Sequence, residues 1–281
     1  IRSGDFDTVV YFMDIAWIGT LGAFLFPVGS ANRVVWGLWR TGRIGPDWVR
    51  IHIAKLADFS IFYSNGAAQD FVRCGLSSDR LSVATNTFRV DCPARNESSR
   101  RDSVLVVGSF NVRKQNDVTL AAFVRVAQRL PTSVRLVFVG AGHEHARIQA
   151  LAEASEFKDR IEFHRASHNE EALREYYDHA ICSVSFGQAG LSVLQSFAYG
   201  VPFVTRRDAI SGGEIENIED GVNGCLCEAN QASLESVLTR LLCNPNYAAE
   251  LGRNALSHYI NKASVHHMVG GFVDAIEHSR G

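Results

Sequence analysis

The stretch SFGQAGLSVLQSFAYGVPFVT, residues 185–205, reads as the end of one strand, a loop, a helix and the next strand. Leu191 and Leu194 recur at the spacing of a helix face that turns toward a core. Gly200 and Pro202 end that helix, because glycine favours helix termini and proline cannot continue a helix. This stretch therefore predicts one unit of a wound α/β fold.

The loop inside this stretch carries residues that suit a polar ligand. Gly187 and Gly190 would let backbone amides approach a sugar or a phosphate closely. Gln188 and Gln195 add the neutral donors and acceptors that sugar hydroxyls need. On spacing alone, an ordinary structural loop explains the same pattern.

The pattern repeats on both sides of this stretch. Strands are expected at residues 104–107, 134–139, 161–164, 180–184 and 202–205, with helices at 117–130, 145–154, 170–179 and 191–199. Strands that alternate with helices predict a Rossmann-like domain with a parallel sheet. Ligands of such sheets bind outside the carboxyl ends of the strands. The loops that start at Gly108, Gly140, His164, Ser185 and Thr205 are therefore expected to face one cleft.

The remaining sequence predicts a second α/β part and a connection. Strands are expected at residues 7–13, 33–39, 59–63 and 81–84, and helices at 15–26, 48–57, 67–74, 234–242 and 246–278. These elements predict a partial N-terminal domain at 1–90, a polar linker at 91–103, a second domain at 104–245 and C-terminal helices at 246–281 that pack back toward the first domain. Residues 15–31 are strongly apolar, but their uninterrupted part is too short to span a bilayer. We expect a buried core helix there, with peripheral contact to a membrane surface as the alternative.

The composition and the cysteine and histidine positions limit the partners that the chain is expected to bind. With 281 residues, a net charge of −2 and a pI near 6.6, the chain has no overall basic field, so nucleic acid is not an expected partner. The six cysteines are scattered, which favours a reducing, cytoplasmic compartment. Cys225 and Cys227 alternate as in a strand, and His143 and His145 would diverge on a helix toward solvent. No metal is therefore expected at either pair.

A second stretch, VVGSFNVRKQND at residues 106–117, places two cations after a strand. Gly108 permits close backbone approach, and a helix start offers free N–H groups. Arg113 and Lys114 would neutralise charge that builds up on a departing phosphate. A solvated cation pair at a helix start is the alternative, although cations oppose the helix dipole there.

Five segments together resemble the C-terminal domain of glycosyltransferase family 4 over about residues 104–242. They are VGS…RK, FVGAG, IEFH, GQAGLSVLQSFAYGVPFVT and GGEIENIEDGVNG. The resemblance implies a GT-B fold, with two Rossmann-like domains that face a cleft and an incomplete N-terminal one. It also implies transfer of a sugar, with retained anomeric configuration and without a metal or other cofactor, from a nucleotide-diphosphate donor to a glycan or lipid-linked acceptor. Such an enzyme of polysaccharide biosynthesis would work in the cytoplasm or at the inner face of the membrane.

The resemblance also implies roles for individual residues. Lys114, with Arg113 beside it, would bind the diphosphate as the catalytic cations, and Gln195 would meet the ribose. The other residues expected to bind the donor are Gly108, Ser109, Gly140, Gly142, His164, Gln188, Ala189, Gly190, Leu191 and Glu216. Glu216, or Glu214 near it, would position the sugar or a loop, and the loops at Gly140 and His164 would hold the base. On the acceptor side, Arg40 or Arg43 of WGLWRTGR is the candidate, with a surface salt bridge as the alternative.

The chain departs from the family pattern at several positions. Gly187 and Gln195 stand where the family typically has two glutamates, and Ser109 stands where it usually has an arginine. Roughly 90 residues precede the predicted linker, so the N-terminal domain is expected to be truncated. Two other functions stay open, namely a donor-binding module without turnover and a nucleotide-sugar epimerase.

Overall fold

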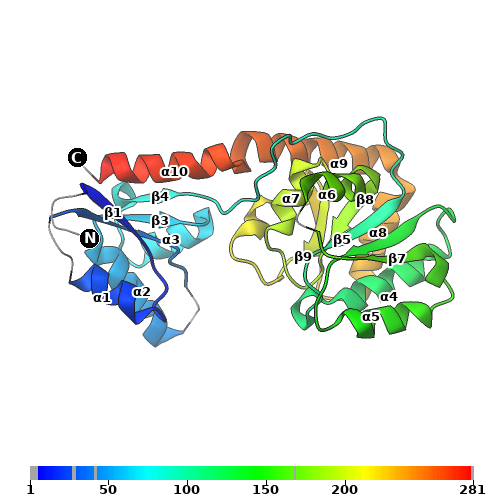
Figure 1. Ribbon diagram of the computed structural model, residues 1–281, viewed down its shortest axis with the longest axis horizontal. Coiled ribbons are helices and arrows are strands. Elements are labelled where there is room, and N and C mark those ends of the chain that lie inside the picture. The colour runs from blue at the N-terminus through cyan, green and yellow to red at the C-terminus, as the bar shows by residue number, and fades with distance from the viewer. Residues whose placement is uncertain (1–5, 27–29, 41–42, 168, 280–281) are drawn as a thin grey trace. The chain divides into compact units, whose positions relative to one another are not determined.

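A computed structural model of the chain describes residues 6–26, 30–40, 43–167 and 169–279. The chain divides into two compact units, coloured along the sequence in Figure 1. Unit 1 comprises Ile1–Asn86 with Val265–Gly281, and unit 2 comprises Thr87–Ser264. Among the described residues, no helix has the length and apolar character needed to cross a membrane.

Unit 2 is built on a sheet of six parallel strands. These are β5 (Ser103–Val107), β6 (Arg135–Val139), β7 (Ile161–His164), β8 (Ala180–Val184), β9 (Phe203–Arg206) and β10 (Gly224–Cys227), in the order β10-β9-β8-β5-β6-β7. Its helices are α4 (Asn116–Ala127), α5 (His145–Glu153), α6 (Glu170–His179), α7 (Ser192–Ala198), α8 (Gln231–Cys243) and α9 (Pro245–His258). The strands and helices predicted for this region are confirmed to within a few residues, including the strand at Cys225 and Cys227, both fully buried.

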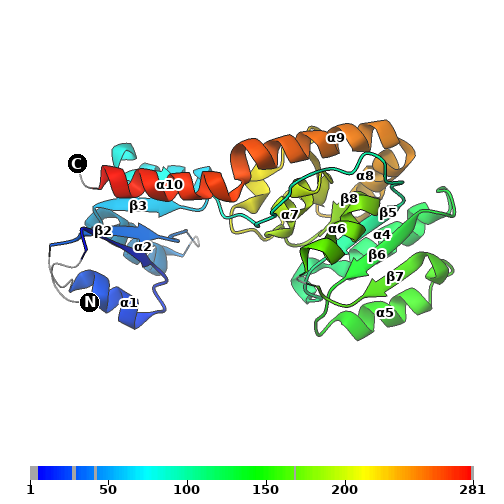
Figure 2. The same ribbon diagram turned by 45° about the horizontal axis from the view of Figure 1, so that its top comes forward.

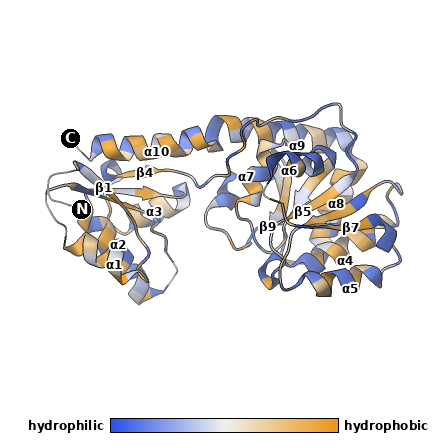
Figure 3. Cartoon of the chain, viewed as in Figure 1, coloured by the Kyte–Doolittle hydropathy of each residue, from blue (hydrophilic) through white to orange (hydrophobic). Residues whose placement is uncertain are grey.

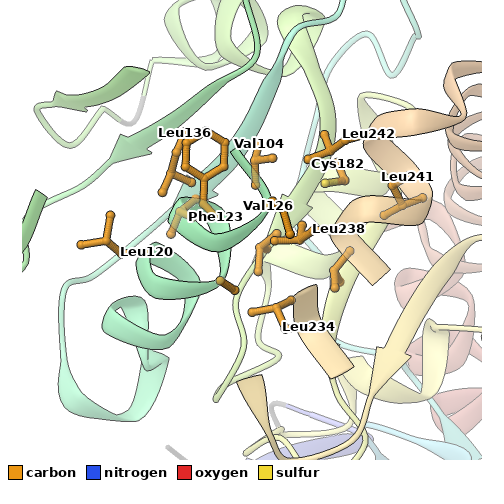
Figure 4. Close-up of a cluster of buried hydrophobic side chains, with 14 of the residues drawn as sticks. Val104, Leu120, Phe123, Val126, Leu136, Cys182, Leu234, Leu238, Leu241 and Leu242 are labelled. Atoms are coloured by element: carbon orange, nitrogen blue, oxygen red, sulfur yellow. The ribbon is translucent and has the colours of Figure 1, made fainter. Parts of the chain in front are cut away.

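The central strand β5 is apolar from Val104 to Val107 because helices cover both of its faces. Val104 and Val106 face the core that α4 and α8 cover, whereas Leu105 and Val107 face the core on the side of α6 and α7. Figure 4 shows the first core, which contains leucines of α8 and Phe123 and Val126 of α4. A strand with helices on both faces needs apolar side chains at every position.

Unit 1 has four parallel strands in sequential order. They are β1 (Thr8–Phe12), β2 (Asn32–Trp36), β3 (Phe59–Phe62) and β4 (Leu81–Val83), accompanied by α1 (Ile18–Leu25), α2 (Ile44–Leu56), α3 (Asn65–Arg73) and α10 (Val265–His278). Figure 2 shows α10 and α2 on opposite faces of this sheet. Val34 packs in the cluster that contains Ala275 of α10, while its neighbour Val35 packs on the side of α2 and α3.

The prediction of a buried core helix at residues 15–31 is wrong. Figure 3 shows α1 as largely apolar, yet Phe24 is its only buried residue. Ile18 is 81% exposed and Phe26 is 80% exposed. Phe24 anchors α1 through an edge contact with Tyr11 of β1, with ring centroids 5.5 Å apart, so one side of the helix carries the packing. Residues 27–29 of the predicted segment lie outside the described residues.

The boundary between the units falls at residues 86–87, ahead of the linker expected at 91–103. That segment runs over unit 2, where buried carbonyl groups accept hydrogen bonds from its arginines. Arg95 Nη1 donates to Gly200 O at 2.5 Å, and Arg101 Nη1 donates to Tyr177 O at 3.0 Å. The C-terminal helices also divide, because α9 belongs to unit 2 and α10 to unit 1. Residues 246–281 are expected to pack toward the first domain, and of these the segment from Val265 onward, which contains α10, belongs to the same unit as residues 1–86.

Candidate functional site

The strand order of unit 2 creates a crevice between two loops. From β5 the chain continues to β6 and β7 on one side, and it then crosses to β8, β9 and β10 on the other. The loops after β5 and β8 therefore diverge at neighbouring strand ends, which is where open α/β sheets bind ligands. These loops carry the segments 108–115 and 185–191.

The loop after β5 forms a tight turn that presents Lys114. The side chain of Asn111 caps this turn, since its Oδ1 accepts a hydrogen bond from Lys114 N at 3.2 Å. Gln115 follows in the left-handed conformation at φ 53° and leads into α4. From the other loop, Gly187 N donates to Lys114 O at 3.2 Å. Hydrogen bonds on both sides thus hold the backbone of Lys114.

Gly187 explains one departure from the family pattern. A Cβ atom at this position would lie 2.2 Å from Arg113 O and 2.9 Å from Gln115 Cγ. No side chain fits there while the turn at 111–115 stays in place. The glutamate expected from the resemblance is thus sterically excluded in this structure.

A cavity of about 710 Å³ lies where the two loops meet; we call it the β5–β8 cavity. Its lining residues are Phe88, Val107, Gly108, Ser109, Asn111, Val112, Arg113, Lys114, His143, Gln188, Gly190, Leu191, Ser192 and Gln195. None of these described lining residues is a carboxylate. No ion pair of Arg113 or Lys114 occurs within the described parts of the chain. The cavity therefore presents positive charge without internal compensation.

Lys114 is a buried cation in unit 2. It is only 8% exposed, and its Nζ would lie 3.2 Å from a Cβ atom added to Gly108. Burial lowers the pKa of Lys114 to about 8, because a charged ammonium group is costly away from water. An anion bound in the cavity would stabilise the charged form.

The structure brings eight of the predicted site residues together in this cavity. They are Gly108, Ser109, Arg113, Lys114, Gln188, Gly190, Leu191 and Gln195. Ala189 lies between two of them but is fully buried, and its N–H donates to Ile210 O at 2.9 Å. Ala189 therefore helps to hold the loop 185–191 in place and does not line the cavity.

Gly140 and Gly142 lie beside the site and do not line the cavity. A Cβ atom on Gly140 would stand 1.9 Å from Gly108 O, and one on Gly142 would stand 2.3 Å from Phe110 O. Both glycines thus allow the loop after β6 to pack directly against the loop after β5. In this structure the two glycines therefore shape the site and do not line it.

His164 lies apart from the predicted donor site. Its ring packs against Tyr176 with centroids 5.0 Å apart, and its Nε2 lies 3.2 Å from Glu162 Oε2. Both belong to a groove of about 390 Å³ beneath α6, which we call the α6 groove. Its lining residues are Asp102, Ser103, Arg135, Val137, Glu162, His164, Glu175, Tyr176 and His179.

The other predicted residues lie elsewhere. Glu216 is exposed and does not line the cavity, whereas Glu214 is buried and accepts a hydrogen bond from Gly212 N at 2.9 Å. Glu214 therefore fixes its own loop. In unit 1, Arg40 Nε lies 3.7 Å from Asp47 Oδ2, and Arg43 is exposed at the start of α2.

Sequence reasoning missed six of the lining residues. They are Phe88, Val107, Asn111, Val112, His143 and Ser192. His143 is exposed, as predicted, but it also reaches the cavity from the loop after β6. The motif FVGAG next to it was the available signal. Phe88 precedes the expected linker, and no local pattern marks it. Within the described residues, no group of three or more His, Cys, Asp or Glu side chains could hold a metal ion.

Comparisons with known proteins assign the chain to a family. The family model described as glycosyl transferases group 1 matches residues 92–258, which is more than half of the chain. No curated protein matches. Solved structures match a larger share of the chain.

Three of these solved structures illustrate the likeness. TarM of S. aureus, in complex with fondaparinux, alpha-GlcNAc-glycerol and UDP, is 16% identical with a TM-score of 0.70, over 91% of this chain and 53% of TarM. HepE of Anabaena in complex with UDP is 16% identical with a TM-score of 0.72, over 92% of this chain and 75% of HepE. A glycosyltransferase of Rickettsia africae is 14% identical with a TM-score of 0.75, over 97% of this chain and 76% of that one. The fold is thus the GT-B fold, and the chain spans about half the length of TarM.

Proposed function

Because this chain belongs to the family of glycosyl transferases group 1, we propose that unit 2 binds a nucleotide-diphosphate sugar in the β5–β8 cavity. One observation carries the proposal. The buried side chain of Lys114 lines a cavity whose described lining residues include Arg113 and no carboxylate. A pyrophosphate supplies the two negative charges that would balance these cations.

The proposed reaction moves the sugar to a glycan or lipid-linked acceptor, with retention of anomeric configuration. When the bond between sugar and phosphate breaks, negative charge builds up on the leaving diphosphate. Lys114 and Arg113 would stabilise that charge from fixed positions, which lowers the barrier without a covalent nucleophile. The acceptor is proposed to bind to unit 1, with Arg40 and Arg43 as candidate contacts.

A direct test is calorimetric titration of the chain with UDP, ADP and GDP, with uridine and inorganic diphosphate as fragments. UDP comes first, because two of the structural neighbours are described in complex with UDP. We expect one diphosphate to bind and its nucleoside alone to bind much more weakly. A folded sample that binds no nucleoside diphosphate would refute the proposal.

A donor-binding module without turnover is the second candidate. It is favoured by the absence of a carboxylate among the described residues that line the cavity. Mass spectrometry of a nucleotide sugar incubated with the chain separates the possibilities. Release of nucleoside diphosphate in the presence of a glycan acceptor indicates transfer, whereas binding with an unchanged donor indicates the module. An isomerised donor without acceptor would indicate an epimerase.

Peripheral contact with a membrane surface belongs to the same proposal, since lipid-linked acceptors lie there. It is supported by the exposed apolar side chains Trp17, Ile18 and Phe26 around α1. Sedimentation with anionic phospholipid vesicles tests it, with Ile18→Ser as the variant expected to bind less. Equal sedimentation of both proteins would argue against this role of α1.

A further inference from the structure

A buried tyrosine lies behind the β5–β8 cavity and contacts one of its lining residues. Gln195 lies on α7, is 6% exposed and lines the cavity. Behind it, the hydroxyl of Tyr177 on α6 donates a hydrogen bond to Gln195 Oε1 at 3.2 Å. Tyr177 itself is fully buried and does not line the cavity.

The surroundings of Tyr177 keep it in one position and in one protonation state. Its ring stacks on that of Tyr199, with centroids 4.7 Å apart and planes 16° apart. Burial raises the pKa of Tyr177 far above neutral, because a phenolate would be stranded away from water. The hydroxyl therefore remains available as a donor to the Gln195 carbonyl.

This contact leaves the amide nitrogen of Gln195 for the cavity. An amide group carries its carbonyl oxygen and its NH2 group on opposite sides, so an oxygen held by Tyr177 turns the nitrogen away from it. Within the described residues, Nε2 has no hydrogen-bond partner and is not among the polar atoms sealed from solvent. Nε2 therefore opens onto the cavity as a donor.

We propose that Tyr177 is a positioning residue that fixes the Gln195 amide, so that its NH2 group donates to a ribose hydroxyl of the bound nucleotide. The proposal rests on the proposed function, since it needs a nucleotide in this cavity. A glutamate at position 195 would accept a hydrogen bond from that ribose hydroxyl. Gln195, with its oxygen held by Tyr177, would instead donate a hydrogen bond to it. Without Tyr177, the amide could rotate and present either group.

The test is a double-mutant cycle read by ribose discrimination. Calorimetry gives the affinity of the full chain for UDP, 2′-deoxy-UDP and 3′-deoxy-UDP, in wild type, Tyr177→Phe, Gln195→Ala and the double variant. We expect wild type to prefer UDP over at least one deoxy analogue by roughly 3- to 10-fold, the range for one neutral hydrogen bond. Tyr177→Phe should lower this preference to about twofold or less, and so should Gln195→Ala. In the Gln195→Ala background, Tyr177→Phe should change nothing further.

Tyr199→Phe is the matched control, because it removes a hydroxyl from the same stacked pair without a contact to Gln195. The Tyr199 hydroxyl donates to Glu170 O at 3.5 Å. This variant should keep the ribose preference of wild type, and thermal unfolding would show that each variant is folded. A loss of preference in Tyr199→Phe as large as in Tyr177→Phe would point to packing and overturn the proposal.

A second measurement does not depend on a variant of Tyr177. In Gln195→Glu, the carboxylate can only accept, so methyl ethers of the 2′- and 3′-hydroxyls should lose more affinity relative to UDP than they lose in wild type. The comparison uses the same analogues in both proteins, so the bulk of the methyl group cancels. An equal loss in both proteins would contradict donation by Gln195.

The outcomes also separate this inference from the proposed function. If UDP binds but Tyr177→Phe keeps the full ribose preference, or still acts when Gln195 is alanine, the positioning role is refuted and nucleotide binding stands. If UDP, ADP and GDP all fail to bind to folded wild type, the proposed function is refuted and this inference with it.

Discussion

The β5–β8 cavity and the α6 groove lie in the same unit and differ in how their charges are partnered. In the groove, Glu162 accepts hydrogen bonds from Arg135 and His164. Burial alone would raise the pKa of Glu162, but these two bonds outweigh it and lower that pKa. In the cavity, Lys114 has no ion-pair partner among the residues that the structure describes, and burial lowers its pKa to about 8.

This difference separates a structural charge from a functional one. A carboxylate paired with an arginine on a neighbouring strand is satisfied within the protein and needs no ligand. A buried cation without a counter-charge raises the free energy of the unliganded protein, and a bound anion removes that cost. If this distinction holds, substitutions in the β5–β8 cavity should weaken UDP binding and substitutions in the α6 groove should not.

The largest effect is expected from Lys114→Ala. Loss of a charge-assisted hydrogen bond should weaken UDP binding by about 1.5 to 3 kcal/mol, which corresponds to roughly 10- to 150-fold. Calorimetry measures the change, and Arg135→Ala in the α6 groove serves as the control. Similar losses in the two variants would remove the distinction between the two regions.

A smaller effect is expected from pH. The empty cavity disfavours protonated Lys114, whereas a bound diphosphate favours it, so binding takes up a proton above pH 8 and weakens as the pH rises. With a pKa of about 8, the protonated fraction falls about tenfold between pH 7 and pH 9. UDP affinity should fall by up to that factor. The terminal phosphate is ionised over this range, since its second pKa is about 6.

The control for this pH profile is the Lys114→Ala variant. Because it lacks the titrating ammonium group, its weaker UDP affinity should stay nearly constant from pH 7 to pH 9. Tris and phosphate buffers at matched ionic strength would show whether buffer ions contribute. A decline in Lys114→Ala as steep as in wild type would assign the titration to another group.

The same contrast shows what the sequence could predict. The strands and helices of unit 2 follow from apolar runs and helix spacing, and the cations of RKQ follow from their place after a strand. The expectation that five loops share one cleft was made without knowledge of the order of the strands in the sheet. Because β5 lies next to β8 and β7 lies at the sheet edge, the loops at Gly108 and Ser185 meet, whereas His164 packs beneath α6.

Other features depend on contacts between distant residues. Gly187 lacks a side chain because Arg113 O occupies the space, and no local pattern indicates that contact. The exposure of Ile18 could not be predicted from the sequence either, since an apolar helix gives the same pattern whether another element covers it or not.

Gly187→Ala should give an intermediate effect. The added Cβ would stand 2.2 Å from Arg113 O, so the turn that carries Lys114 must move. We expect a loss of about 1 to 3 kcal/mol in the free energy of unfolding, as for other overpacked sites, and a severalfold loss of UDP affinity. Gly190→Ala is the stability control, because its Cβ would meet nothing within 4 Å. Unchanged stability in Gly187→Ala would show that the turn adapts at little cost.

The smallest effect is expected from His164→Ala in the α6 groove. The resemblance to family 4 implies that the loop at His164 holds the base, but the His164 ring points toward Glu162 and Tyr176. UDP affinity should therefore change by less than about twofold. The unfolding free energy should fall by no more than about 1 kcal/mol, because the pair with Glu162 is partly exposed. A tenfold loss of affinity for UDP, with no loss for inorganic diphosphate, would instead show that the ring contributes to base recognition. The ion pair with Glu162 would then no longer mark the α6 groove as a purely structural site.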